Sequence, residues 1–164
     1  MTGQGRAIQI AVEVEDAGWT ARLPDVEALT ETAAMTAADL ADSDVDGEIV
    51  VLLTNDTEVQ ALNARFRALD KPTNVLSFPA PPTATGSLGD IALALGVCAR
   101  EAAEQHKSLA HHFQHLVAHG VLHLLGYDHE ADDEAEEMEA VERAVMTRLG
   151  APDPYAPASD AAHG

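Results

Sequence analysis

The chain contains few bases, a single cysteine and no long hydrophobic run. Nine Lys and Arg face 28 Asp and Glu, for a net charge of −19, which disfavours any surface that binds nucleic acid through many phosphates. Cys98 is the only cysteine, so no internal disulfide can form, as is usual in a reducing cytoplasm. No apolar run approaches the roughly 18 residues of a membrane span, and the first residues lack the basic and apolar regions of a secretory signal. These absences predict a cytoplasmic protein without a membrane contact.

The acidic residues are unevenly distributed. Residues 1–48 hold 11 acids and 2 bases, and residues 130–164 hold 10 acids and 2 bases. Residues 49–129 hold 7 acids and 5 bases, a net charge of −2, and they contain seven of the eight histidines. Because local potential decides what enters a site, a site in this nearly neutral middle could accept an anionic substrate. The acidic flanks could equally be solubilising surface.

A length of 164 residues suits one domain, which we place at residues 1–155, with residues 156–164 as a disordered tail. Alternating or β-branched runs predict strands, and helical spacing of apolar residues predicts helices. Asn55, followed by Glu58, and Ser108 are expected helix caps, and Val59, Leu62 and Phe66 are expected on one apolar stripe. The predicted order is β α β α β β α α α, an α+β domain with one small sheet and about five helices. The expected strands are 8–14, 47–55, 74–79 and 88–95; the expected helices are 24–41, 55–69, 96–106, 108–125 and 133–149.

The segment HGVLHLLGYDH, residues 119–129, has the spacing of a metal site. His119 and His123 are four residues apart on a predicted helix, so both imidazoles project from one face. Gly126 can end that helix in a left-handed conformation and let the chain return with His129 as a third ligand. Three protein ligands leave a fourth tetrahedral position for water, as in catalytic zinc sites. We therefore predict one zinc ion per chain on a helix and its following loop, a zincin-like arrangement.

Three other interpretations of this segment stay open. His119, His123 and His129 could be histidines with no shared partner, as could the four histidines before them. Of those four, His115 lies one turn before His119 and could support the metal site, but a surface position is favoured. The spacing also occurs in metzincin proteases, where the residue after the first histidine is a glutamate that acts as general base. That position is Gly120 here, which argues against a protease. A non-catalytic factor with a structural zinc ion is the third possibility.

The segment FRALDKPTNVLSFP, residues 66–79, supplies a candidate catalytic residue. Arg67 lies late in its predicted helix, ahead of a loop that leads into a strand. Its guanidinium presents a planar set of donors that matches phosphate oxygens, and it could stabilise charge at a phosphorus transition state. Asn74 and Ser77 could line the same cleft, or serve only as turn and strand residues.

These two segments, with the intervening LGDIAL and the acidic helix DDEAEEMEAVE closing on APDPY, resemble the YbeY family of metal-dependent bacterial endoribonucleases. The resemblance covers roughly residues 48–155. It implies a mixed four-stranded sheet with helices around it, zinc bound by the three histidines of the box, and an arginine that serves activity. By position, these residues are His119, His123, His129 and Arg67.

The resemblance also implies a function. It predicts a zinc-dependent endoribonuclease that cleaves single-stranded RNA in ribosomal RNA maturation, at the 3′ end of the small-subunit RNA, and in ribosome quality control. The expected partners are ribosomal RNA and the small ribosomal subunit or its proteins, with no DNA. Zinc would activate a water molecule and polarise a phosphate oxygen. The general base, and the choice between a hydroxide and the RNA 2′-hydroxyl as nucleophile, stay open.

Overall fold

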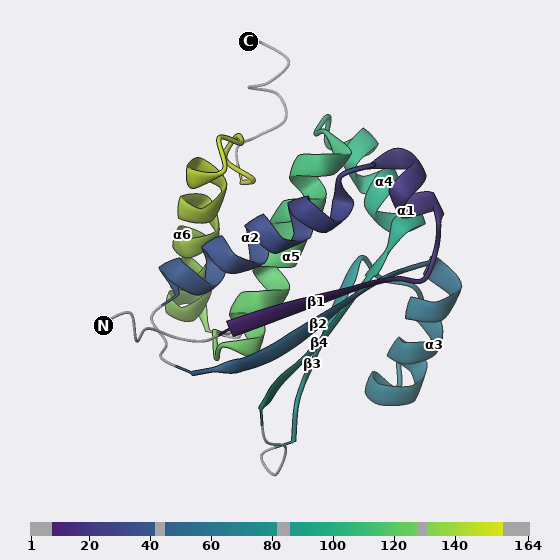
Figure 1. Cartoon of the computed structure of the whole chain (residues 1–164), viewed down its shortest axis with the longest axis horizontal. Helices are drawn as coiled ribbons and strands as arrows, with labels where there is room; N and C mark the ends of the chain where they lie inside the picture. Colours follow the sequence, from purple (N-terminus) through teal and green to yellow (C-terminus); the bar gives the residue numbers. More distant parts are fainter. Residues whose placement is uncertain (1–7, 42–44, 82–85, 128–130, 156–164) are drawn as a thin grey trace.

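The structure is a computed structural model that describes residues 8–41, 45–81, 86–127 and 131–155. These residues form four strands and six helices (Figure 1). In chain order they are β1 (Ile8–Val14), α1 (Gly18–Arg22), α2 (Val26–Leu40), β2 (Gly47–Thr54), α3 (Asp56–Arg67), β3 (Val75–Pro79), β4 (Ser87–Ala94), α4 (Leu95–Glu104), α5 (Leu109–Leu124) and α6 (Asp132–Arg148).

The four strands form one mixed sheet in the order β1-β2-β4-β3. β1, β2 and β4 are parallel, and β3 runs antiparallel to β4 at the edge of the sheet. The expected α+β fold with a mixed four-stranded sheet is confirmed. The edge position of β3 matters for the site, because one side of its backbone has no strand partner in the described sheet.

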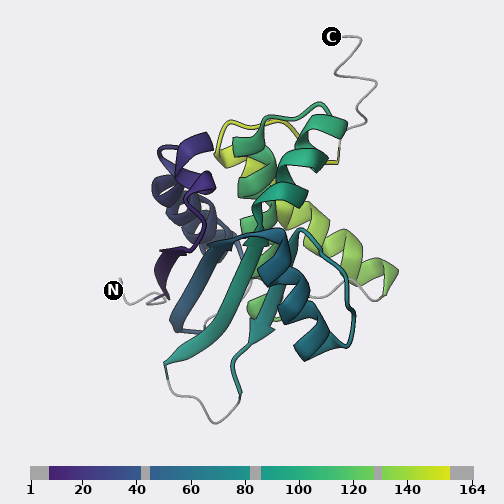
Figure 2. The ribbon, with the colours of Figure 1, turned by 90° about the vertical axis from the view of Figure 1, so that its right-hand side faces the viewer.

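The two faces of the sheet are covered differently (Figures 1 and 2). α2 and α5 pack on one face, with α6 against their outer side, whereas α3 lies alone on the opposite face. β4 serves both sides, because Ile91 and Leu93 belong to the main core while Ala92 and Ala94 belong to a smaller core under α3. The second half of β4, IALA, is buried on both faces and is therefore apolar.

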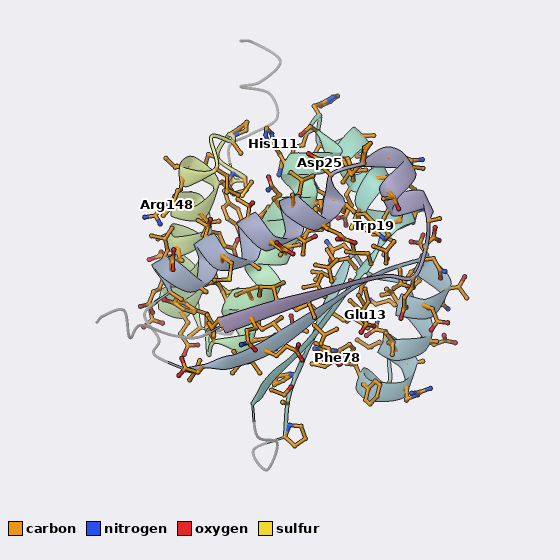
Figure 3. All side chains as sticks on the ribbon, viewed as in Figure 1. Glu13, Trp19, Asp25, Phe78, His111 and Arg148 are labelled. Atoms are coloured by element: carbon orange, nitrogen blue, oxygen red, sulfur yellow. The ribbon has the colours of Figure 1, made fainter. Side chains whose placement is uncertain are left out.

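The main core is anchored by Trp19 and Phe113, whose ring centroids lie 5.1 Å apart. Both side chains are fully buried, and Trp19 Nε1 donates a 2.8 Å hydrogen bond to the carbonyl oxygen of Thr54 at the end of β2. Figure 3 shows Trp19 on the α2–α5 side of the sheet and Phe78 on the α3 side. The histidines of α5 and Arg67 of α3 therefore belong to helices that cover opposite faces of the sheet.

Most predicted boundaries hold to within about two residues, and the expected caps are present. Asn55 Oδ1 accepts from the Glu58 amide at 2.8 Å, and Ser108 Oγ accepts from the His111 amide at 3.0 Å. The described residues contain six helices instead of about five, because the five-residue helix α1 is too short to show helical periodicity. None of the described helices is long and apolar enough to cross a membrane. The predicted tail, residues 156–164, lies outside the described residues.

The predicted apolar stripe of α3 is buried only in part. Val59 is fully buried and Leu62 is partly buried, but Phe66 is 59% exposed and does not belong to the core stripe. Phe66 lies in the last turn of the helix, where its ring contacts Phe78 of the edge strand at a centroid distance of 5.3 Å. The apolar stripe is therefore buried only over the earlier turns of α3.

Candidate metal and catalytic site

His119 and His123 lie one turn apart on α5, as their spacing predicts. Their Nε2 atoms are 3.1 Å apart, and their rings are nearly perpendicular, at 86°. The two side chains therefore direct the same ring nitrogen toward one point. His129, the third predicted ligand, lies outside the described residues.

The end of α5 fixes the orientation of His123. Gly126 has φ 105°, and its amide bonds to the carbonyl oxygen of His123 at 3.1 Å while the Tyr127 amide bonds to that of Leu122 at 3.0 Å. This pair of bonds is a Schellman motif, which needs the left-handed residue that glycine supplies. The motif turns the Tyr127 carbonyl oxygen back to within 3.1 Å of His123 Nδ1. The local sequence LLGY thus supplies an acceptor for one of the two imidazoles.

Glu142 of α6 orients His119. Its side chain is 1% exposed, and Oε2 lies 2.8 Å from His119 Nδ1 while Oε1 lies 2.6 Å from His115 Nε2. The Tyr155 hydroxyl also donates to Oε1. Burial alone would raise the pKa of Glu142, but the hydrogen bonds from His115, His119 and Tyr155 lower its pKa to about 2. The carboxylate is therefore ionised and accepts hydrogen bonds at neutral pH.

These partners determine which nitrogens carry protons. A carbonyl oxygen and an ionised carboxylate only accept, so Nδ1 of His123 and Nδ1 of His119 each carry the hydrogen. In neutral imidazoles, both Nε2 lone pairs then face one another at 3.1 Å, which is repulsive unless a cation lies near them. A histidine whose other nitrogen donates to a carboxylate or carbonyl is the usual form of a metal ligand.

The spacing of the two nitrogens also fits zinc. Two ligands, each about 2.0–2.1 Å from a tetrahedral zinc ion, lie about 3.3–3.4 Å apart. The observed 3.1 Å is close to that separation. Over the described ranges, no group of three or more His, Cys, Asp or Glu residues is arranged to hold a metal ion, so a third ligand would have to come from elsewhere. The donor set present fits the ion, and ligation by His119, His123 and His129 stays a prediction.

Arg67 ends α3 and reaches the open edge of β3. Ala68 follows with φ 59°, which turns the chain away from the helix. The carbonyl oxygen of Asn74 accepts from the Ala94 amide, and the Ala80 amide donates to the carbonyl oxygen of Leu88, so the even-numbered residues of this segment bond to β4. Odd-numbered residues face the other way, and Ser77 therefore presents its carbonyl oxygen to the open edge. Arg67 Nη2 donates to that oxygen at 2.6 Å.

Ser77 joins the arginine to the histidine helix. Its carbonyl oxygen accepts from Arg67, while its hydroxyl makes a long, 3.4 Å hydrogen bond to the carbonyl oxygen of Gly120 on α5. Gly120 is the neighbour of His119 in the sequence. The structure thus places Arg67 and the histidine pair on either side of one edge strand, and Ser77 lies between them. Asn74 instead donates from Nδ2 to Glu101 Oε1 at 2.9 Å, which ties the loop to α4.

Gly120 has no room for a side chain. A Cβ atom there would lie 2.9 Å from Ile91 Cγ2 and 3.2 Å from Ser77 Oγ. Both distances are shorter than ordinary van der Waals contact, and the side chain of Ile91 is fully buried in the main core. The glutamate that metzincin proteases carry at this position could not be accommodated in this packing.

Sequence reasoning missed three residues of this network. His115, expected at the surface, has a side chain that is only 12% exposed and bonds to Glu142, so that expectation is wrong. Tyr155 stacks edge-on against His115 at a centroid distance of 5.4 Å. Glu142 falls between Met138 and Val145 on the buried face of α6. An acid in the middle of an apolar stripe was the signal that could have indicated it.

The chain is similar to known proteins over most of its length. Residues 12–150 match the sequence profile of a family described as Endoribonuclease YbeY. Proteins named Endoribonuclease YbeY are 51% identical over 140 residues in Nitrobacter hamburgensis, 51% over 152 residues in Rhodopseudomonas palustris and 48% over 159 residues in Paramagnetospirillum magneticum. These alignments cover 80%, 88% and 90% of this chain and 74%, 80% and 96% of the relatives. The solution structure of a Thermotoga maritima protein matches with a TM-score of 0.53 at 25% identity, covering 91% of this chain and 99% of that one.

Proposed function

This chain belongs to the YbeY family of endoribonucleases, and from that premise we propose that it is a zinc-dependent enzyme that cleaves single-stranded ribosomal RNA. In this proposal His119, His123 and His129 hold one zinc ion, and Arg67 is the catalytic residue. The substrate is the 3′ end of the small-subunit RNA, cleaved during maturation and ribosome quality control. The partners are ribosomal RNA and the small subunit or its proteins, in the cytoplasm, without DNA or a membrane.

One observation carries the proposal. The two Nε2 atoms of α5 converge at 3.1 Å while each Nδ1 is held by an acceptor, Glu142 or the Tyr127 carbonyl oxygen. Zinc held by these histidines would supply Lewis acidity toward water and toward a phosphate oxygen. Glu142 keeps His119 in the tautomer that can ligate, and its negative charge, buried behind the imidazole, strengthens the histidine as a donor.

Arg67 is suited to the charge that develops on phosphate. One of its nitrogens holds the Ser77 carbonyl oxygen at 2.6 Å, which fixes the guanidinium at the edge of β3. The side chain is exposed and has further N–H donors, and a guanidinium can bind two oxygens of one phosphate. A donor held in place before the reaction stabilises the transition state without reorganisation.

Limited attraction for free RNA agrees with a ribosomal substrate. The acids of the chain outnumber its bases by 28 to 9, and 21 of those acids lie outside residues 49–129. Few phosphates can be neutralised by such a surface, so the remaining affinity would come from the ribosomal particle or its proteins.

A cleavage assay separates this proposal from a protease and from a non-catalytic zinc protein. Purified protein is incubated with single-stranded RNA and with casein, each with and without chelator, beside the His119→Ala and Arg67→Ala variants. We expect metal-dependent RNA cleavage, intact casein, and folded variants without activity. Digestion of casein would favour a protease. RNA left intact by wild-type protein that unfolds when the metal is removed would indicate a structural zinc ion.

A further inference from the structure

A groove of about 780 Å³ lies beside the proposed catalytic arginine, between the end of α3 and the β3–β4 pair. Its charged and aromatic lining comes from Arg65, Phe66, Arg67, Phe78 and Asp90, which together define the α3–β3 groove. The groove is on the face of the sheet that carries only α3. It is therefore separate from the buried network of histidines and Glu142.

Phe66 is the most exposed large hydrophobic side chain of the described residues, at 59%. Its ring meets Phe78 at a centroid distance of 5.3 Å and an angle of 58°, and each ring has an arginine beside it. The Arg65 guanidinium carbon is 5.5 Å from the Phe66 centroid, and that of Arg67 is 5.8 Å from the Phe78 centroid. The smaller core closes on Val59, Leu76, Ala92 and Ala94 without Phe66, so burial does not explain this ring.

The charges of the groove are unusual for this chain. Arg65 and Arg67 line the groove and Lys71 follows them in the sequence, so three of the nine bases lie within seven residues. In the part of the chain that the structure describes, no carboxylate pairs with Arg65 or Arg67, whereas Arg100 pairs with Asp56 and Arg143 with Asp153. An exposed pair of unneutralised arginines on a protein of charge −19 provides a local attraction for phosphate.

Asp90 adds a polar acceptor on the sheet surface. It is the only acid among the described residues that line the groove, and it pairs in register with Phe78. Its carboxylate would repel phosphate, but it can accept a hydrogen bond from an amino group on a base edge. Asp90 therefore suits the edge of a base, whereas the two arginines suit a phosphate.

We propose that the α3–β3 groove is a nucleobase-stacking subsite, in which one base of single-stranded RNA stacks on Phe66 beside Phe78 while Arg65 contacts the adjoining phosphate. Aromatic rings with arginines in a groove are what sequence-tolerant binding of single strands requires. The inference rests on the proposed ribonuclease function and adds where the RNA lies: across the edge strand β3, from the groove to the histidines. Within the groove, Phe66, Phe78 and Arg65 position the substrate and take no part in the chemical step, which is assigned to Arg67.

The test uses full-length, metal-loaded protein and a short unstructured RNA that carries 2-aminopurine, whose fluorescence falls when the base stacks. Binding is recorded by stopped flow at enzyme excess, before turnover, and KM and kcat are measured separately. Phe66→Ala should weaken binding and raise KM by about 10- to 100-fold, remove the fluorescence change and leave kcat nearly intact. Phe66→Tyr should retain binding within about threefold, since its ring still stacks.

Two further variants sharpen the result. Leu69→Ala removes another exposed apolar side chain, 49% exposed and outside the groove lining, and should bind as wild type. Arg65→Ala should reduce the log–log salt slope of binding by about 0.7, the contribution of one phosphate contact on a single strand.

The possible failures can be told apart. If wild-type protein cleaves RNA and Phe66→Ala binds it with unchanged affinity and an unchanged fluorescence signal, the stacking subsite is wrong and the groove serves another partner, such as a protein segment. If wild-type protein neither binds nor cleaves single-stranded RNA, the proposed ribonuclease function fails and the subsite fails with it.

Discussion

The two faces of the sheet carry two kinds of polar structure. On the α5–α6 side, Glu142 is buried at 1% exposure and receives hydrogen bonds from three side chains. On the α3 side, Arg65 and Arg67 are exposed and lie beside rings instead of carboxylates. The first arrangement fixes the geometry of a few atoms, and the second leaves donors available to a ligand. The difference indicates that the α5–α6 side orders a metal site and that the α3 side binds a substrate.

We expect the largest effect of any single substitution at Arg67, which lies at the edge strand between the two faces. Its substitution tests whether substrate chemistry and metal binding can be separated. Arg67→Lys keeps the charge but loses the planar donor set, so turnover should fall on the order of 10²- to 10³-fold. Metal content should not change, because the side chain contacts Ser77 and not the histidines. Steady-state kinetics and elemental analysis of the same preparation measure both. Near-wild-type turnover would show that Arg67 only braces the edge strand.

A substitution of Glu142 tests whether the α5–α6 side orders a metal site. Glu142→Gln removes the charge behind His119 and should weaken metal affinity by about 10- to 100-fold, the usual effect of losing a partner that orients a ligand. Glu139→Gln, on the same helix with a side chain that is 40% exposed, is the matched control and should bind metal as wild type. Competition with a chromophoric chelator gives the affinities. Equal affinities for the two variants would mean that the hydrogen bond to His119 does not orient a ligand.

Gly120 lies where α5 packs closely against Ile91 of β4. Gly120→Ala places a Cβ atom 2.9 Å from Ile91, and overpacking of this kind destabilises a fold by about 1–3 kcal/mol. Denaturant unfolding measures the change in the free energy of unfolding. An unchanged midpoint would show that α5 can shift away from β4 without loss.

The smallest expected effect concerns the exposed side and its few bases. Each phosphate that is neutralised on a single strand contributes about −0.7 to the log–log salt slope, so two to four contacts predict a slope of roughly −1.4 to −2.8. We also expect free RNA to be a poorer substrate than ribosomal particles. A much steeper slope, or equal rates on both substrates, would indicate a basic surface that these residues do not provide.

The sequence predicted what depends on local spacing. The four-residue interval of His119 and His123, the helix end at Gly126 and the cap at Asn55 are set by neighbouring residues, and the structure has each of them. The chain order of strands and helices and the arginine near the end of α3 were likewise accessible, and the family resemblance added the mixed four-stranded sheet.

The residues that were missed depend on contacts between distant segments. Glu142 resembled the solvated acids around it until α6 packed on α5, and Tyr155 reaches it from beyond the last helix. Phe66 had the spacing of a core residue, yet only tertiary packing shows that no element covers it. Helical periodicity identifies a face of a helix but not what lies against that face.

Zinc content tests most directly whether His119, His123 and His129 form one metal site. Protein purified without added metal is analysed by elemental analysis alongside a variant in which His119, His123 and His129 are all changed to Ala, with folding of both checked by circular dichroism. We predict one zinc ion per chain in the wild-type protein and none in the folded triple variant. Undiminished zinc in that variant would contradict this prediction.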